Sequence, residues 1–381
     1  MTTLDIYFDK QSSPGVMAAK LWISSGSRYD PQGQKGAHQL LGSLLCRGCG
    51  PYDFVEIGDR VEGCGACLNC ETYQDGLLIS LKCIQDDVFK LLPILGWMIK
   101  EPHIDENQVN IEKELTIQAL GRQKEDPFYV AFDGWRRLAY GEGPYAHDPL
   151  GRIKDLKLIN KKELIPLANS ISKTHKVLVI SGSYPLGLEE QIIDIKPFDS
   201  LLREDCAEQH KTILDNCTQK KESTIQLQIE NTSQIVLMLG NTTISYSHPD
   251  AIHLQLLSCY LGSGMSSKLF IELREKHGVA YDVGVHHPIR ENNSPFVIHA
   301  STSKEKSIHA LELVHKCLQE TLEKPLSEKE LTQAKAKYRG RIAHFTQTVS
   351  QKAERKAHLL GLKLNINHDQ NNLERLEDIT I

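Results

Sequence analysis

The chain has 381 residues, of which 40% are hydrophobic and 24% charged, a composition typical of a globular protein long enough for two domains. Its 44 basic and 49 acidic residues give a formal net charge of -5, so it lacks the basic balance of a nucleic-acid-binding protein. We also expect no membrane partner and a cytoplasmic location, because the sequence shows no signal-like or membrane-spanning apolar run and its ten cysteines are typical of reduced thiols.

Helix and strand patterns alternate through the first half of the sequence. Apolar residues recur at helical spacing in the stretch 36–45, which predicts a helix whose buried face includes His38. Further helices are predicted by the same spacing over residues 85–100, 107–123 and 127–140. Strands are predicted by short apolar runs over residues 15–23, 77–83 and 175–182.

The pattern starts again in the second half. The strand pattern at 15–26 has a counterpart at 233–244, and the apolar helix at 37–48 has one at 252–264. A later strand pattern, PFVIHAST, likewise matches LLISLKC of the first half. We therefore interpret the chain as one unit of strands and helices used twice.

The segment between the two halves differs in composition from both. Residues 191–222 lose periodicity and are rich in polar and charged residues, which is typical of a linker. The sequence thus predicts an N-terminal domain over residues 1–190 and a C-terminal domain over residues 223–381.

The most specific motif is LGSGMSSKLFIELREKHGVAYDVGVHH, residues 261–287. It is similar to the second domain of the pitrilysin/insulinase zinc peptidases, in the branch of mitochondrial processing peptidase. In the first half, KGAHQLL, VEGCGACLNCETYQDGLLISLK, IEKELTIQAL and GPYAHDPLGRIKDL follow the family's order and spacing. The resemblance implies an α+β fold of two homologous domains, each a mainly antiparallel sheet packed with helices on one face, arranged as half of a clamshell.

The family's inverted zinc motif, H-x-x-E-H, is degenerate in this sequence. His38 stands at the first ligand position, but Leu41 replaces the general base and Gly42 the second histidine. Ala119 stands at the position of the third ligand, a glutamate on a later helix. One imidazole cannot hold a catalytic zinc, so we expect no metal in this chain and a His38 that is packed or hydrogen-bonded on its helix.

Two acidic residues lie on the helix of the missing third ligand. Glu112 and Glu114 precede Ala119 by seven and five residues. Glu112 matches a family glutamate that faces the same way as the ligand without being one. Neither residue restores the zinc site.

Arg274 and Tyr281 match the arginine and tyrosine that the family's second domain contributes to the active site. A guanidinium is a permanent charge with forked donors, and a phenol can donate to a carbonyl oxygen or a developing oxyanion. The resemblance therefore implies that both residues act in trans, at the zinc site of a partner subunit.

The resemblance also implies the partners. Bacterial members of this branch are often heterodimers of a zinc-bearing subunit and an arginine–tyrosine subunit, and this sequence fits the second kind. The zinc cofactor is then expected in the homologous partner, and an extended peptide is expected as substrate. Asn69, in the stretch GACLNC, matches the edge strand to which the peptide adds.

Five cysteines form a separate cluster in the sequence, Cys46, Cys49, Cys64, Cys67 and Cys70. Such spacing can indicate a zinc or iron–sulfur site. Along a strand, however, the side chains of Cys64 and Cys70 face one way and that of Cys67 the other, which disfavours a shared ion. The alternative is that these cysteines pack as small hydrophobic residues.

Three hypotheses remain from the sequence. The favoured one is the non-zinc subunit of a heterodimeric peptidase, inactive alone. The second is a structural or peptide-binding protein without a proteolytic role, and the third is a cysteine-ligated metal or redox protein. Family members usually continue past the segment that ends here at Ile381, so the C-terminal domain is expected to be naturally short or truncated.

Overall fold

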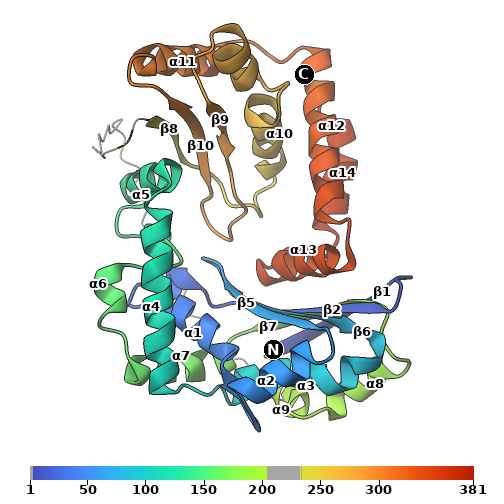
Figure 1. Ribbon diagram of the computed structural model, residues 1–381. Coiled ribbons are helices and arrows are strands. Elements are labelled where there is room, and N and C mark those ends of the chain that lie inside the picture. Colours follow the sequence, from blue (N-terminus) through green and yellow to red (C-terminus); the bar gives the residue numbers. More distant parts are fainter. Residues whose placement is uncertain (1–2, 204–231, 233) are drawn as a thin grey trace. The chain divides into compact units, whose positions relative to one another are not determined.

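The computed structural model describes residues 3–203, 232 and 234–381, which form two compact units (Figure 1). The described residues of Met1–Gly121, His147–Leu214 and Phe345–Ile366 form unit 1. Those of Arg122–Ala146, Asp215–His344 and Asn367–Ile381 form unit 2. Residues 204–222 of the expected linker lie outside the described residues, and residues 191–203 belong to unit 1.

Unit 1 contains a mixed five-stranded sheet in the order β1-β7-β2-β6-β5. β1 pairs with β7 in parallel, and the other neighbouring strands pair antiparallel. The strands are Leu4–Lys10 (β1), Val16–Ile23 (β2), Cys67–Thr72 (β5), Leu77–Ile84 (β6) and Lys176–Gly182 (β7). The side chains of β2 and β7 are almost entirely buried, because helices cover both faces of the sheet.

One face of this sheet packs on the large apolar core of unit 1. Its helices are Ala37–Leu45 (α1), Phe54–Glu62 (α2), Val88–Lys100 (α3), Glu106–Gln123 (α4), Ile153–Leu156 (α6), Lys161–Ser172 (α7), Leu188–Gln191 (α8) and Phe198–Arg203 (α9). A short ladder joins Gly48–Cys49 (β3) and Tyr52–Asp53 (β4). Short 3-10 turns cover Ser27–Tyr29, Gln85–Asp87 and Ile192–Asp194.

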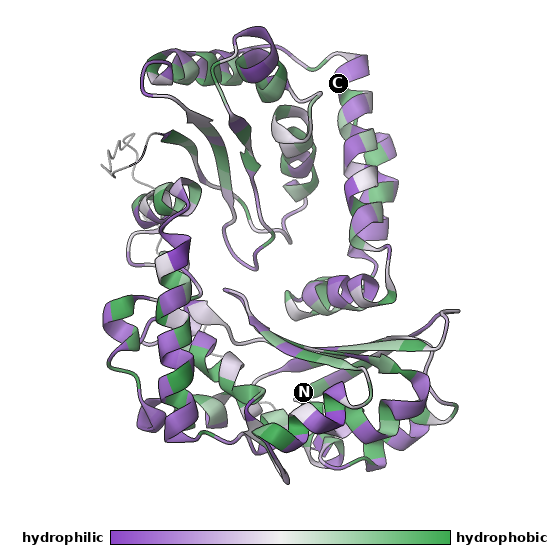
Figure 2. Ribbon diagram, viewed as in Figure 1, coloured by the Kyte–Doolittle hydropathy of each residue, from purple (hydrophilic) through white to green (hydrophobic). Residues whose placement is uncertain are grey.

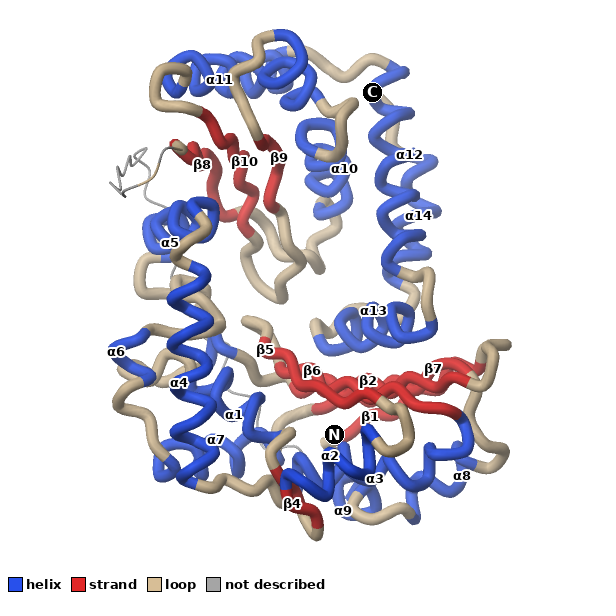
Figure 3. Tube along the Cα trace, viewed as in Figure 1, coloured by secondary structure: helices blue, strands red, loops and turns tan. Residues whose placement is uncertain are grey.

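The opposite face of the same sheet is covered by Val349–Gly361 (α13), as Figure 3 shows. The ammonium group of Lys20 on β2 donates to Glu354 of α13 over 2.7 Å. The ring of His358 packs edge-on against Trp22, with 4.8 Å between the ring centroids. An added Cβ on Gly361 would lie 2.2 Å from the Trp22 ring, so only glycine allows this close approach.

Unit 2 contains an antiparallel three-stranded sheet in the order β8-β10-β9. Its strands are Ile235–Thr242 (β8), Asp282–His286 (β9) and Pro295–Thr302 (β10). Its helices are Pro127–Tyr140 (α5), Ala251–Gly262 (α10), Ser307–Glu323 (α11), Glu328–Phe345 (α12) and His368–Asp378 (α14), and Phe270–Lys276 (η4) is a π-helix.

The same plan occurs in both units. The strand order β2-β6-β5 of unit 1 recurs as β8-β10-β9, and α1 and α10 follow the first strand of each set. Later in each half come an 18-residue helix, α4 or α12, and then α5 of 14 residues or α13 of 13. The repeat and the α+β class that the sequence predicts are confirmed.

In each repeat, the helix that follows the 18-residue helix packs on the sheet of the other repeat's unit. α5 comes from the first half of the chain, but it belongs to unit 2 and contacts β8. α13 comes from the second half, but it belongs to unit 1 and contacts β2 and β7. Each unit is therefore built from both halves of the sequence.

Hydropathy is distributed as this layered packing requires. Figure 2 shows hydrophobic residues along the strands of each sheet and mixed hydrophobic and hydrophilic residues on the helices. None of the helices in the described part of the chain combines the length and the apolar content that crossing a membrane requires.

Candidate functional site

Helix α1 begins at a carboxylate from the preceding loop. The main-chain N–H groups of Gly36 and His38 donate to the two oxygens of Asp30 over 2.7 and 2.9 Å. Asp30 therefore satisfies donors that the first turn of a helix leaves unpaired. Gly36 has a φ of 107°, and an added Cβ would lie 2.6 Å from Leu156, so glycine is required at this turn.

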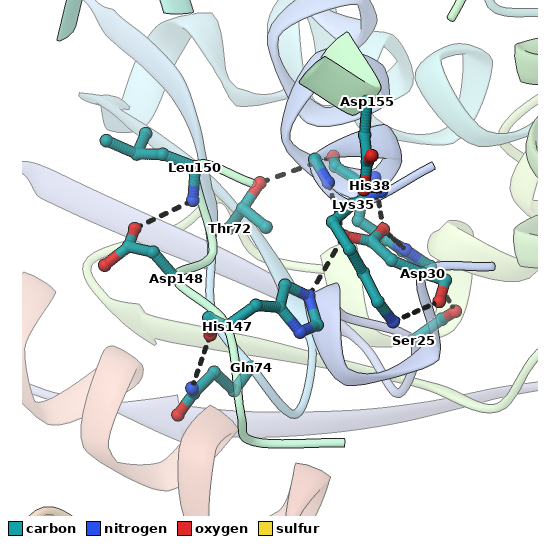
Figure 4. Close-up of polar contacts among 11 residues, drawn as sticks. Ser25, Asp30, Lys35, His38, Thr72, Gln74, His147, Asp148, Leu150 and Asp155 are labelled. Atoms are coloured by element: carbon teal, nitrogen blue, oxygen red, sulfur yellow. Dashed lines mark hydrogen bonds and ion pairs between the residues drawn. The ribbon is translucent and has the colours of Figure 1, made fainter. Parts of the chain in front are cut away.

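The side chain of His38 is held between two polar residues (Figure 4). Its Nδ1 lies 2.7 Å from Oδ1 of Asp30, and its Nε2 lies 2.9 Å from Oγ of Ser25. His38, Asp30 and Ser25 are 0%, 4% and 1% exposed. The order Ser–His–Asp is that of a nucleophilic triad, but a fully buried hydroxyl cannot meet a substrate, so this arrangement is structural.

Asp30 is the electrostatic centre of this cluster. Nε2 of His147 lies 3.4 Å from its second oxygen. Burial by itself would raise the pKa of Asp30, but the hydrogen bonds from His147, His38 and the N–H of Gly36 outweigh it and hold that pKa well below its usual range. Asp30 is therefore a permanent buried anion that both imidazoles face.

The other positions of the family's zinc motif do not fit a zinc ion. Leu41 is completely buried in the core of unit 1, and Ala119 has no donor atom. An added Cβ on Gly42 would lie 2.8 Å from Oγ1 of Thr72, so side chains from β5 fill the space of the second ligand. Both ring nitrogens of His38 already have partners. No group of three or more potential metal ligands is found among the described residues.

Glu112, one of the two acidic residues near Ala119, forms an ion pair within unit 1. Glu112 on α4 is buried and accepts a hydrogen bond of 2.7 Å from Nε of Arg47. This ion pair links the end of α1 to α4. Glu114 is exposed on the same helix.

Cys67 and Cys70 lie on β5 and face opposite ways, but Cys64 lies in the turn between α2 and β5, so its predicted place on the strand is wrong. The side chains of Cys64 and Cys70 pack against the core of unit 1, whereas Cys67 is exposed. Nζ of Lys90 lies 2.9 Å from Sγ of Cys64. Burial raises the pKa of Cys46 to about 11, which keeps this thiol protonated.

Asn69 lies on β5, at an edge of the sheet in unit 1. Its side chain is exposed, and its amide donates to Glu71 of the same strand over 3.1 Å. Within the described ranges of the chain, β5 pairs with β6 alone. The structure thus places Asn69 on an edge strand, while its role toward a peptide stays a prediction.

Arg274 and Tyr281 are brought together in unit 2. Nη1 of Arg274 on η4 donates to the main-chain carbonyl of Tyr281 over 3.0 Å. The guanidinium also lies over the ring of Phe270, 5.0 Å from its centroid. Tyr281 directly precedes β9, its main-chain N–H donates to the carbonyl of Ser301 on β10, and its side chain is 59% exposed.

Sequence reasoning missed the residues that hold His38. Asp30 and Ser25 lie in the loop SSGSRYDP before α1, and His147 comes from the distant motif GPYAHDPLGRIKDL. A conserved spacing could not be read from one sequence. The sequence offered one indication of these residues. It predicts that His38 is buried on a helix that provides no polar partner for it, and a buried histidine requires polar partners, which must then come from other segments.

Comparisons with known proteins cover most of the chain. Residues 9–147 match the sequence profile of the insulinase family, peptidase family M16, and residues 175–338 match that of the peptidase M16 inactive domain. A protein of Rickettsia felis described as an uncharacterized zinc protease is 24% identical over 89% of this chain and 80% of its own length.

Further relatives carry different descriptions. A Helicobacter pylori protein described as a non-peptidase homolog is 22% identical over 95% of this chain and 83% of its own length. The human mitochondrial-processing peptidase subunit beta is 21% identical over 64% of this chain and 49% of its own length. The fold matches a crystal structure of a peptidase M16 inactive domain from Pseudomonas fluorescens, with a TM-score of 0.82, 20% identity, and coverage of 99% and 89% of the two chains.

Proposed function

Because the chain belongs to the insulinase-like peptidase family M16, in its processing-peptidase-like branch, we propose that it is the non-zinc subunit of a heterodimeric peptidase. In this proposal Arg274 and Tyr281 act on a peptide bound at the zinc site of a homologous partner. One observation carries it: the exposed guanidinium of Arg274 donates to the main-chain carbonyl of Tyr281, whose phenol is also exposed, on a chain whose own zinc positions do not fit the metal.

The local geometry suits these roles. The bond from Arg274 to the carbonyl of Tyr281 fixes the guanidinium next to the first residue of β9, and Phe270 supports its flat face. The hydroxyl of Tyr281 has no hydrogen-bond partner within the described residues, so it is available to a ligand. π-helical segments such as η4 occur frequently at functional sites.

The two groups would perform different tasks. The guanidinium of Arg274 can bind a peptide carbonyl or carboxylate through its remaining N–H groups. The phenol of Tyr281 can donate to the oxygen on which negative charge develops during cleavage of an amide. Neither group can generate a nucleophile, so this chain alone is expected to cleave no peptide.

The test is a complex of this chain with a homologue that carries an intact H-x-x-E-H motif. Arg274→Ala or Tyr281→Phe should lower kcat/KM roughly a hundredfold to a thousandfold, as loss of one oxyanion donor does. The mass of the complex and the zinc content of the partner should not change. Lys276→Ala, on the exposed side of the same η4 segment, is the control and should keep full activity.

A second function is favoured by β5. An inactive family member could bind an extended peptide at this edge strand, where Cys67, Asn69 and Glu71 have exposed side chains. Full peptidase activity of a complex that carries both Arg274→Ala and Tyr281→Phe would favour this function.

The proposal keeps a cytoplasmic location, since all eight cysteines of the described residues are free thiols.

A further inference from the structure

The sheet of unit 1 has a second open edge, β1, on the side opposite β5. The N–H of Lys176 donates to the carbonyl of Thr3, and the N–H of Gln11 donates to the carbonyl of Gly182. In a parallel ladder, alternate residues of a strand bond to the same neighbour. The main-chain groups of the odd-numbered residues therefore face β7, and those of Ile6 and Phe8 point to the free edge.

These edge groups are unpaired. β1 pairs with β7 alone, and the N–H and carbonyl groups of Ile6 and Phe8 have no hydrogen-bond partner in the part of the chain that the structure describes. Exposed edges of this kind accept a further strand from another chain unless they are blocked by charge, proline or a covering element.

A groove of about 450 Å³ runs along this edge. It is lined by β1 and by the segment that contains α8 and α9. The side chains of Ile6 and Phe8 point to the core face of the sheet, where Ile193 and Leu202 form the other wall. Ile193 is 55% exposed although it is a large apolar residue. An added strand would find an apolar site for alternate side chains here.

The charged residues that line the groove are both acidic. Glu189 accepts a hydrogen bond of 2.8 Å from the hydroxyl of Tyr184, which orients its carboxylate. Asp5 on β1 directly precedes the edge-facing Ile6, its carboxylate lies 2.9 Å from Nε2 of His175, and 44% of its side chain is exposed. Because side chains alternate along a strand, Asp5 faces the side of the sheet opposite Ile6. Opposite charges on neighbouring strands attract.

We propose that the free edge of β1 binds an extended peptide segment of a partner protein by strand addition. The segment has alternating residues: apolar side chains enter the groove beside Ile6 and Ile193, and lysine or arginine side chains lie beside Asp5. This site is separate from Arg274, Tyr281 and β5, so it does not depend on the proposed peptidase function.

The test uses the full chain and a fluorescent peptide of alternating valine and lysine. A peptide with glutamate in place of lysine tests the charge, and a peptide with N-methylated valines tests main-chain pairing. Both should bind at least about tenfold more weakly by fluorescence anisotropy. Hydrogen exchange should slow at the amides of residues 4–10 when the valine–lysine peptide is bound.

Two variants and one control locate the site. Ile6→Pro removes an N–H that faces the edge and spares the bonds to β7, since proline is tolerated on edge strands. Ile193→Lys places a charge in the groove. Both should weaken binding at least about tenfold, and Ile193→Lys, at an exposed side chain, should also leave thermal unfolding unchanged. Leu186→Lys, at a neighbouring residue that is 86% exposed and outside the groove lining, should bind as the parent does.

Other outcomes would overturn the proposal. Equal binding of the three peptides, no binding of any, or protection confined to residues 67–72 would exclude β1 as the site. Self-association that Ile6→Pro abolishes would identify a second copy of the chain as the occupant instead of a partner's peptide. Analytical ultracentrifugation of the free chain makes that distinction.

Discussion

The polar cluster at α1 in unit 1 and the arginine–tyrosine pair in unit 2 differ in where their polar groups point. His38 is fully buried, and both its ring nitrogens have partners in the same unit. Arg274 and Tyr281 are exposed, and the Tyr281 hydroxyl is without a partner among the described residues. One repeat has closed its polar site, whereas the other leaves polar groups available to a ligand.

This difference shows that the surroundings of His38, and not only the residue types at the zinc-motif positions, are unsuited to a metal ion. At α1 the donors that would face a metal are satisfied by Asp30 and Ser25, and the space is filled by Thr72. A buried histidine without partners would destabilise the fold, so such a replacement network is physically required.

The largest expected effect is on the closed site. Asp30→Ala leaves His38, His147 and two helix N–H groups without their shared acceptor, so the free energy of unfolding should fall by about 3 to 5 kcal/mol in urea titration. Asp5→Ala is a matched control, because Asp5 also pairs with a histidine, His175, but is 44% exposed. A similar small loss for both variants would contradict the central role of Asp30.

The second largest effect concerns α5 and α13, the two helices that each belong to the unit of the other half of the chain. His358 of α13 packs on Trp22 of β2, and His286 of β9 packs on Phe132 of α5, with ring centroids 4.8 and 4.7 Å apart. Burial, together with nearby basic side chains, lowers the pKa of each from 6.5 to about 4. Each folded unit therefore favours a neutral ring where the unfolded chain binds a proton.

Stability should consequently fall as the pH drops from about 6.5 to 4, by up to roughly 3 kcal/mol for each histidine. Chemical unfolding at several pH values measures this slope. His358→Leu should remove one part of it and His286→Leu the other. His309→Gln, at an exposed histidine of α11, is the control and should leave the slope unchanged.

A third effect tests whether the zinc site can be restored. The double variant Leu41→Glu, Gly42→His rewrites the family motif, but the new histidine meets Thr72 and the glutamate enters the apolar core. We expect no zinc after dialysis, and the single variant Gly42→His should lower the free energy of unfolding by about 1 to 3 kcal/mol through overpacking. One tightly held zinc per chain would show that the site has only lost its ligands.

Sequence reasoning reached the repeat, because local periodicity carries it. The strands at 77–83 and 175–182 are found within one residue of β6 and β7. The exchange of α5 and α13 could not be foreseen, since the apolar face of a helix does not specify which sheet it covers. The Asp30 network was missed for a related reason: its members are distant in sequence, and only the fold brings them together.

The smallest expected effect on stability comes from a substitution on β5, which tests whether peptide binding there can be lost without a change in folding. The amide of Asn69 contacts only the exposed Glu71, so Asn69→Ala should change the free energy of unfolding by less than about 0.5 kcal/mol. If β5 binds an extended peptide, the same variant should weaken binding of that peptide while the valine–lysine peptide at β1 binds as before. An exposed side chain on one edge of a rigid sheet cannot alter binding at the other edge. Equal weakening of both peptides would therefore mean that β5 and β1 are coupled through the sheet of unit 1. The open polar groups of the molecule would then have to be compared with that whole sheet, because neither edge would act alone.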